Sequence, residues 1–226
     1  MELRDRMALA LDVDDLVVAL RLAHQLQPWF GVAKVGLELY AAAGPDSVAS
    51  LSEAGFDVFL DLKLHDIPTT VRRAARVVGS FGASYLTLHA HGGPVMLRAG
   101  VEGLTEGAAA AGMPTPMAVA VTVLTSDADA PPHILGNRIT ASVEGGCGGI
   151  VCAAADVREA KQLAPRLTTV VPGIRLPGGD PNDQARASTP DEAFAAGADL
   201  LVVGRAVTAA PDPAAAAAAL SETLSA

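Results

Sequence analysis

The stretch Asp61-Leu-Lys-Leu-His-Asp-Ile-Pro-Thr-Thr70 places three charged side chains directly after an apolar run, Gly55-Phe-Asp-Val-Phe-Leu60. The run is bounded by glycine and rich in β-forming residues, so it predicts a buried strand with Asp61 at its C-terminal end. Side chains alternate between the two faces of a strand, so Asp61 and Lys63 should share one face. Charged groups are unusual at the end of a buried strand unless a site uses them.

Lys63 lies between two carboxylates in this stretch, Asp61 and Asp66, and Asp66 falls where the chain turns into a helix. Opposite charges within a few ångströms favour the charged form of a lysine. We therefore expect Lys63 to be a protonated ammonium held in one place, as a proton donor must be. A salt bridge on the surface is the alternative interpretation of the same residues.

The whole chain repeats this arrangement of an apolar run followed by a helical segment. The predicted strands cover residues 7–11, 31–36, 55–60, 84–89, 116–122, 148–152, 167–171 and 199–204. The predicted helices cover about 14–27, 44–54, 68–81, 94–110, 132–144, 156–163, a segment from 189, and 213–224. Strands that are apolar throughout are typical of a parallel sheet covered on both faces. Eight such units without a break in composition predict an α/β fold, a single (β/α)8 TIM barrel domain spanning residues 1–226.

An open, doubly wound parallel sheet is the alternative arrangement of the same elements. Such a sheet often carries a glycine-rich turn, Gly-x-Gly-x-x-Gly, between its first strand and first helix. No such motif follows the strand predicted over residues 7–11. The sequence therefore favours the closed barrel.

The composition limits the classes of function. Half of the 226 residues are hydrophobic, which is enough for one large core. The formal net charge of −9 disfavours nucleic acid as a partner, because phosphate backbones bind basic surfaces. Cys147 and Cys152 have neither disulfide nor zinc spacing and are typical of a protein in a reducing cytoplasm. No apolar run reaches the roughly 18 residues of a membrane span and no signal peptide is visible, so we expect a soluble protein.

Polar side chains follow most of the predicted strands. They are Asp12, Lys34, Asp61, Lys63, His89, Thr125, Arg175 and Arg205. Active sites of (β/α)8 barrels form at the C-terminal ends of the strands, so we expect these groups to meet at one mouth. Gly204 and Arg205 open the last helical region, where backbone N–H groups and a guanidinium predict a phosphate site. A surface cation is the alternative for Arg205.

Two further features border the predicted mouth. His89 and His91 have the spacing of a metal-binding pair on a strand, but no third carboxylate partner is evident beside them. We therefore predict no metal site and expect packed or hydrogen-bonding histidines. The loop from Ile174 to Ala187 is longer than most strand-to-helix loops, which favours a lid, and Gln184 is its one amide able to reach a ligand.

With these residues assembled, the chain resembles the orotidine 5'-phosphate decarboxylases of the bacterial type over nearly its whole length. The motifs that carry the resemblance are Ala10-Leu-Asp12, Lys34-Val-Gly36, Asp61-Leu-Lys-Leu-His-Asp-Ile-Pro68 with Thr70, His89 with Gly92-Gly93, Leu124-Thr-Ser126, Pro172-Gly-Ile-Arg175, Asp183-Gln184 and Val203-Gly-Arg205. The Asp-x-Lys-x-x-Asp element alone marks a wider group of barrels, and the added motifs make the resemblance specific. Thr69 departs from the pattern, since a small polar residue such as asparagine is common there.

The resemblance implies a role for each site residue. Lys63 would protonate C6 of the pyrimidine as carbon dioxide leaves, and Asp61 would hold Lys63. Asp66 would reach into the site of the partner subunit, so the active unit would be a homodimer to which Thr70 contributes in the same way. The other implied contacts are ribose for Asp12, Lys34 and Thr70, pyrimidine for Thr125, and phosphate for Arg175, Gln184, Gly204 and Arg205. The resemblance implies neither a metal nor an organic cofactor.

Two rival functions fit parts of the sequence. Sugar-phosphate decarboxylases and aldolases share the Asp-x-Lys-x-x-Asp element, but they need a metal and an acidic residue at the end of the second strand. That position here is Lys34, a cation that would repel a metal. A non-catalytic barrel that binds a phosphorylated ligand is the other rival, and it would not require Lys63 between two carboxylates.

Overall fold

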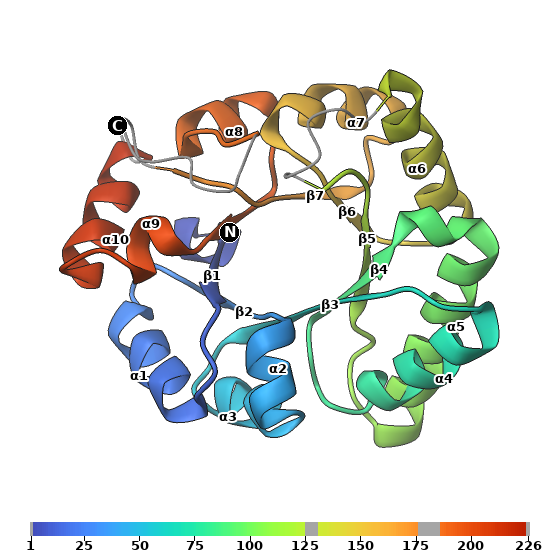
Figure 1. Cartoon of the computed structure of the whole chain (residues 1–226), viewed down its shortest axis with the longest axis horizontal. Helices are drawn as coiled ribbons and strands as arrows, with labels where there is room; N and C mark the ends of the chain where they lie inside the picture. The colour runs from blue at the N-terminus through green and yellow to red at the C-terminus, as the bar shows by residue number, and fades with distance from the viewer. Residues whose placement is uncertain (1, 125–130, 176–185, 225–226) are drawn as a thin grey trace.

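The computed structural model describes residues 2–124, 131–175 and 186–224. Eight parallel strands close into one barrel in the order β1 to β8 (Figure 1). They are β1 Met7–Leu11, β2 Val32–Val35, β3 Asp57–Leu64, β4 Tyr85–His89, β5 Met117–Val121, β6 Gly149–Val151, β7 Thr168–Val171 and β8 Leu200–Val203. The predicted (β/α)8 barrel is confirmed, and the open sheet is excluded because β1 pairs with β8.

Helices surround the barrel (Figure 1). They are α1 Leu16–Leu26, α2 Leu37–Ala43, α3 Asp46–Glu53, α4 Pro68–Gly79, α5 Gly93–Ala111, α6 Pro132–Glu144, α7 Val157–Leu163, α8 Pro190–Ala196, α9 Arg205–Thr208 and α10 Pro213–Thr223. Short 3-10 helices accompany them, namely η1 Leu3–Arg6, η2 Ala90–Gly92 and η3 Ala154–Asp156. Among the described residues, none of these helices combines the length and the apolar character that a membrane span needs.

Local signals explain where two of the helices begin. Proline occupies the first turn of α4, as predicted, because its missing N–H has no partner there in any helix. Thr189 and Glu192 form a reciprocal capping box at the start of α8. Helix α2 was not predicted, because its seven residues lie between two glycine signals that leave room for only a short helix.

The interior of the barrel contains one compact apolar cluster. Its members are Ala8, Ala10, Val32, Phe59, Val119, Val170, Leu200 and Val202. Because strand side chains alternate, the next inward position toward the C-terminal end lies two residues further along each strand. Two steps beyond Ala10, Val32 and Phe59 stand Asp12, Lys34 and Asp61. The apolar interior therefore ends in a layer of charged side chains at the barrel mouth.

The opposite end of the barrel is covered by polar contacts that join distant segments. Arg6 of η1 donates through Nη2 to the Ala198 carbonyl at 2.7 Å. Lys161 pairs with Asp199 at 2.6 Å, and the Thr169 hydroxyl donates to the same carboxylate at 2.9 Å. These contacts stabilise the N-terminal end of the barrel, which is the end opposite to the active sites of this fold.

Candidate active site

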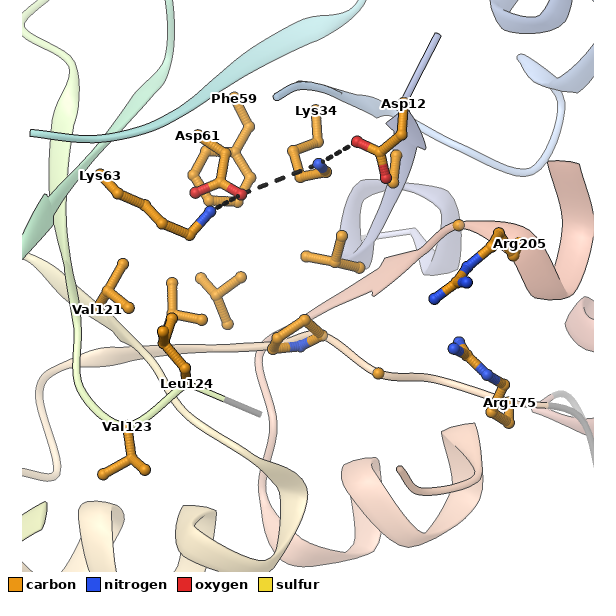
Figure 2. A pocket seen from close by; sticks show the side chains of 17 residues that line it. Asp12, Lys34, Phe59, Asp61, Lys63, Val121, Val123, Leu124, Arg175 and Arg205 are labelled. Carbon is orange, nitrogen blue, oxygen red and sulfur yellow. Dashed lines mark hydrogen bonds and ion pairs between the residues drawn. The ribbon is translucent and has the colours of Figure 1, made fainter. Parts of the chain in front are cut away.

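A cavity of about 360 Å³ opens at the C-terminal end of the strands (Figure 2). Its lining includes Asp12, Lys34, Phe59, Asp61, Lys63, Val121, Val123, Leu124, Val151, Pro172, Arg175, Gly204 and Arg205. Six of the predicted polar strand-end residues line it, Asp12, Lys34, Asp61, Lys63, Arg175 and Arg205. The sequence therefore located the mouth and most of its polar groups correctly.

Four of the lining residues form a row of alternating charge on β1 to β3, which we call the charged row: Asp12, Lys34, Asp61 and Lys63. Lys34 Nζ donates to Asp12 Oδ1 at 2.8 Å and lies 3.9 Å from Asp61 Oδ2. Lys63 Nζ donates to the same Asp61 oxygen at 2.7 Å (Figure 2). The Lys34 and Asp61 side chains are only 10% and 16% exposed, so water screens this pair weakly. Each charge is compensated inside the row, which keeps it tolerable near the core.

We predicted that Asp61 and Lys63 share one face of a regular strand. Their side chains do meet, but the backbone of β3 is irregular between them. The register of β3 against β4 shifts between Leu60 and Leu64, and Lys63 has a φ of 49°, which is rare for a residue other than glycine. The fully buried hydroxyl of Thr87 on β4 accepts from the Lys63 N–H at 2.8 Å and donates to Asp61 Oδ1 at 3.0 Å. Thr87 thus holds both the backbone of Lys63 and its carboxylate partner.

Asp66 and Thr70 lie outside this cavity. Asp66 is exposed, and its Oδ1 accepts from the Ile67 N–H at 2.6 Å. Thr70 is exposed in the first turn of α4. In the described part of this chain, Lys63 pairs with Asp61 and forms no ion pair with Asp66. Of the two aspartates that border Lys63 in the sequence, Asp61 therefore pairs with it within this chain, and the role of Asp66 toward a partner subunit stays a prediction.

Two arginines line the cavity on the side of β7 and β8, and we call them the arginine pair: Arg175 and Arg205. Arg175 follows β7 and is 9% exposed, and its Nη1 donates to the Ile174 carbonyl at 2.9 Å. Arg205 begins α9 directly after Gly204. Figure 2 shows both guanidinium groups directed into the same part of the cavity, across from Lys63. Guanidinium groups arranged in this way are suited to bind a phosphate.

The wall between these two polar groups is apolar. It consists of side chains from β5, β6 and the segment after β5, namely Val121, Val123, Leu124 and Val151. A flat ring could pack on this wall with one edge facing Lys63. The cavity is thus divided into an ion-paired side, an apolar wall and a cationic side.

Three histidines meet beside the charged row but outside the cavity lining. The ring centroids of His65 and His89 are 5.4 Å apart, and those of His65 and His91 are 5.5 Å apart. His89 Nδ1 accepts from the His91 N–H at 3.3 Å, and Arg138 lies 3.5 Å from His91 Nδ1. Burial, with added repulsion from Arg138 and the neighbouring cations, lowers the pKa of His89 to about 4. His89 is therefore neutral near pH 7 and is a packed, hydrogen-bonding residue, as expected.

Two residues that shape the charged row received no role from the sequence: Thr87 was missed, and Gly36 was named only as part of the motif Lys34-Val-Gly36. Thr87 is a polar residue inside an apolar strand, and that position was the available signal. At Gly36 a Cβ atom would lie 3.0 Å from Asp12 Oδ1 and 3.1 Å from Lys34 Nζ, so a side chain there would crowd their ion pair. Its signal was its place two residues beyond Lys34. Thr125 and Gln184, both predicted ligand contacts, lie outside the described residues, as do residues 176–185 of the predicted lid.

No group of three or more His, Cys, Asp or Glu side chains within residues 2–124, 131–175 and 186–224 is arranged to hold a metal ion. Where a metal would need several carboxylates or imidazoles, the charged row has the Lys34 ammonium between Asp12 and Asp61. The Lys34 ammonium thus takes the place between the two carboxylates that a divalent ion would need.

Comparison with known proteins agrees with this geometry. Residues 5–220 match the family described as Orotidine 5'-phosphate decarboxylase / HUMPS family. An orotidine 5'-phosphate decarboxylase of Moorella thermoacetica is 42% identical, with 98% of this chain and 92% of that protein covered. One of Anaeromyxobacter dehalogenans is 45% identical, with 97% and 98% covered. The crystal structure of an orotidine 5'-phosphate decarboxylase from Lactobacillus acidophilus superposes with a TM-score of 0.81 at 32% identity, covering 98% of this chain and 100% of that one. With a match across almost its full length, this chain belongs to the orotidine 5'-phosphate decarboxylase / HUMPS family.

Proposed function

We propose that this chain decarboxylates orotidine 5'-phosphate to uridine 5'-phosphate in pyrimidine biosynthesis, with Lys63 as the proton donor to C6 and without a cofactor. The observation that carries the proposal is the Lys63 ammonium, held 2.7 Å from Asp61 in the wall of a cavity whose far side bears the arginine pair. A proton donor and a phosphate grip on opposite sides of one cavity match a phosphorylated substrate that reacts at its other end.

The chemistry follows from the charges in the row. When the bond between C6 and the substrate carboxylate breaks, carbon dioxide leaves and the electron pair stays on C6. The adjacent Lys63 ammonium stabilises that negative charge as it develops. It then transfers one proton from Nζ to C6, becomes a neutral amine, and regains a proton from water. Asp61 holds the Lys63 ammonium in place before the reaction, because its Oδ2 accepts a hydrogen bond from Lys63 Nζ at 2.7 Å.

Each of the remaining site residues is proposed to bind one part of the substrate. Arg175, Arg205 and the backbone of Gly204 bind the phosphate, and Asp12 and Lys34 bind ribose hydroxyls. The pyrimidine packs on the apolar wall near Val121 and Val151, which lie between the two polar sides of the cavity. Thr125 and Gln184 are proposed as further contacts to the pyrimidine and the phosphate. Binding energy from the unreactive phosphate can align the base against Lys63.

A direct assay tests the activity. Purified protein is incubated with orotidine 5'-phosphate and excess chelator, and the loss of ultraviolet absorbance that accompanies decarboxylation is followed. We expect turnover that the chelator does not change. Absence of turnover would refute the proposed function. Turnover that disappears with chelator would instead indicate a metal-dependent reaction, such as those of sugar-phosphate decarboxylases and aldolases.

We also propose that the active unit is a homodimer in which Asp66 and Thr70 complete the site of the partner subunit. The support is their position: both are exposed just beyond Lys63, and Ile67 between them presents an apolar side chain that is 66% exposed. An exposed apolar side chain beside a functional carboxylate is suited to an interface. We further propose that residues 1–226 act as one domain in the cytoplasm.

Mixed subunits test the shared site. Lys63→Ala and Asp66→Ala chains should each have little activity alone. After subunit exchange, a hybrid dimer has one site with both substitutions and one site with neither, so up to half of its sites should work. A mixture that exchanges subunits, shown by differently tagged chains, yet stays inactive would contradict a shared site.

A further inference from the structure

The backbone of Arg175 is held by a chain segment that returns from the far end of the long loop after β7. The Arg175 N–H donates to the Ser188 carbonyl at 2.9 Å, and the Ser188 N–H donates to the Gly173 carbonyl at 3.3 Å. These bonds form an isolated parallel bridge between Ile174 and Ser188. The position of Arg175 therefore depends on the position of residues 186–189, which we call the return segment.

The return segment is fixed at two more points. Thr189 caps α8, with its N–H donating to Glu192 Oε2 at 2.9 Å. At the other end, Arg186 Nη2 forms a short ion pair with Asp156 Oδ1, at the end of η3. The two side chains are only 22% and 12% exposed. The ion pair thus ties the return segment to the connection that follows β6.

We propose that Arg186 and Asp156 are a positioning pair for Arg175: they hold the return segment in place and thereby set the reach of the Arg175 guanidinium toward the substrate phosphate. This inference rests on the proposed function only in identifying the ligand of Arg175 as a phosphate. Neither Arg186 nor Asp156 lines the cavity, so neither is proposed to touch substrate.

The burial of the ion pair argues for a role in positioning. An exposed pair contributes little because water screens both charges and long side chains lose freedom in forming it. In a mostly buried pair, loss of one partner leaves the other charge without compensation, so the structure around the pair must rearrange to bring that charge to water. Asp156 Oδ2 has no hydrogen-bond partner among the described residues, so Arg186 is the side chain there that compensates this carboxylate. A shift of about 1 Å in a group that aligns substrate can lower the rate by about a hundredfold.

Arg158 provides a matched control. Together with Arg186 it lines a second cavity, separate from the candidate active site, and it lies two residues from Asp156 in the sequence. It is exposed, and within the described ranges its guanidinium forms no ion pair. Arg158→Gln therefore removes the same charge from the same surface without disturbing the positioning pair.

The experiment compares two substrates, orotidine 5'-phosphate and orotidine, which lacks the phosphate. Wild type is assayed first, and its turnover of orotidine 5'-phosphate tests the proposed function independently. For Arg186→Gln we expect kcat/KM with orotidine 5'-phosphate to fall about tenfold to a hundredfold, mainly through KM, with orotidine turnover within about twofold of wild type. Arg186→Lys, which keeps the charge, should recover part of the loss. Arg158→Gln should match wild type.

A double variant keeps the test decisive if Arg186→Gln does not fold. Asp156→Asn/Arg186→Gln removes both charges at once and leaves no buried charge unpaired, and its folding is checked by thermal melting. It should show the same selective loss with the phosphorylated substrate. Equal losses with both substrates would overturn the inference in favour of a purely structural ion pair. Kinetics like those of wild type for folded variants would overturn it as well.

Discussion

The charged row and the arginine pair lie at the same barrel mouth, yet they are held in place in different ways. The row stands on or directly beyond β1, β2 and β3, and its members are partners of one another at 2.7–3.9 Å. Arg175 and Arg205 stand beyond the ends of β7 and β8 (Figure 2). The position of Arg175 depends on the hydrogen bond that its N–H donates to the carbonyl of Ser188, 13 residues later in the sequence. The sheet therefore places the groups proposed to react, and the connections place the groups proposed to bind the unreactive end of the substrate.

This difference has a physical basis. A proton donor must be held within a fraction of an ångström of its target, and side chains on strands of a closed barrel have little freedom to move. A phosphate can be bound from several directions by long guanidinium side chains, so its binding groups tolerate a less rigid support. Substitutions in the two regions should consequently change different kinetic quantities.

The largest effect is expected from Lys63→Ala, which removes the proposed proton donor from the end of the charged row. Loss of general acid catalysis costs about two to four orders of magnitude, and loss of charge stabilisation adds to it. We expect kcat to fall by about 10⁴-fold or more, while the thermal midpoint and binding of uridine 5'-phosphate are largely kept. Steady-state kinetics measure kcat, thermal melting gives the midpoint, and calorimetric titration measures the binding of uridine 5'-phosphate. Near-normal turnover by a folded Lys63→Ala protein would falsify the role.

Arg205→Ala tests the other side of the comparison. A charge-assisted contact to phosphate is worth roughly 1.5–3 kcal/mol, and more when buried. We expect kcat/KM for orotidine 5'-phosphate to fall about tenfold to a thousandfold, with little change for orotidine. The control is Arg166→Ala, which removes an exposed arginine just before β7, at the opposite end of the barrel. If orotidine turnover falls as far as that of the phosphorylated substrate, Arg205 supports the fold or the chemistry and is not the phosphate grip.

Thr87→Val sharpens the comparison because it leaves every charge of the row in place. It removes only the hydroxyl that contacts Asp61 and the backbone of Lys63. A buried carboxylate oxygen and a backbone N–H then lose a partner, which costs about 1–3 kcal/mol of unfolding free energy. We expect about a tenfold loss of kcat with both substrates, measured beside urea unfolding. Thr169→Val is the matched control, because its hydroxyl also donates to a carboxylate, Asp199, but at the other end of the barrel. It should destabilise without lowering kcat. Equal kcat losses in both variants would refute a specific role for Thr87.

The smallest effect concerns the histidines beside the row. The folded-state pKa of His89 is lowered to about 4, so the unfolded chain binds more protons between about pH 4 and the usual value of 6.5. Stability should therefore be fully present above pH 6.5 and fall as pH decreases toward 4. Because His89 is only half buried, we expect a loss of about 1 kcal/mol, well below the full shift. His89→Asn should reduce this loss between pH 7 and pH 5, whereas His24→Asn, on an exposed face of α1, should not. If the pH dependence of stability in His89→Asn equals that of wild type, the lowered pKa of His89 is not its cause.

Much of this site was predictable because it depends on local patterns. Apolar runs of strand length give the barrel, and the period of two along β1, β2 and β3 carries the apolar interior up to Asp12, Lys34 and Asp61. Long-range contacts were not predictable in this way. The left-handed backbone of Lys63 depends on Thr87, which is 24 residues away in the sequence. The anchoring of Arg175 by the return segment could not be predicted either, because a local sequence pattern does not show which residues at the end of a long loop bond to its start.

At position 63, the left-handed backbone favours glycine, whereas the proposed chemistry requires an ammonium. Glycine adopts a positive φ more easily than any other residue, and it would favour this backbone by about 1 kcal/mol. A glycine has no ammonium to offer, so the residue best for folding is useless for proton transfer. Selection for stability alone would therefore remove from position 63 the group that we propose as the proton donor. A Lys63→Gly chain should be an inactive protein at least as stable as Lys63→Ala.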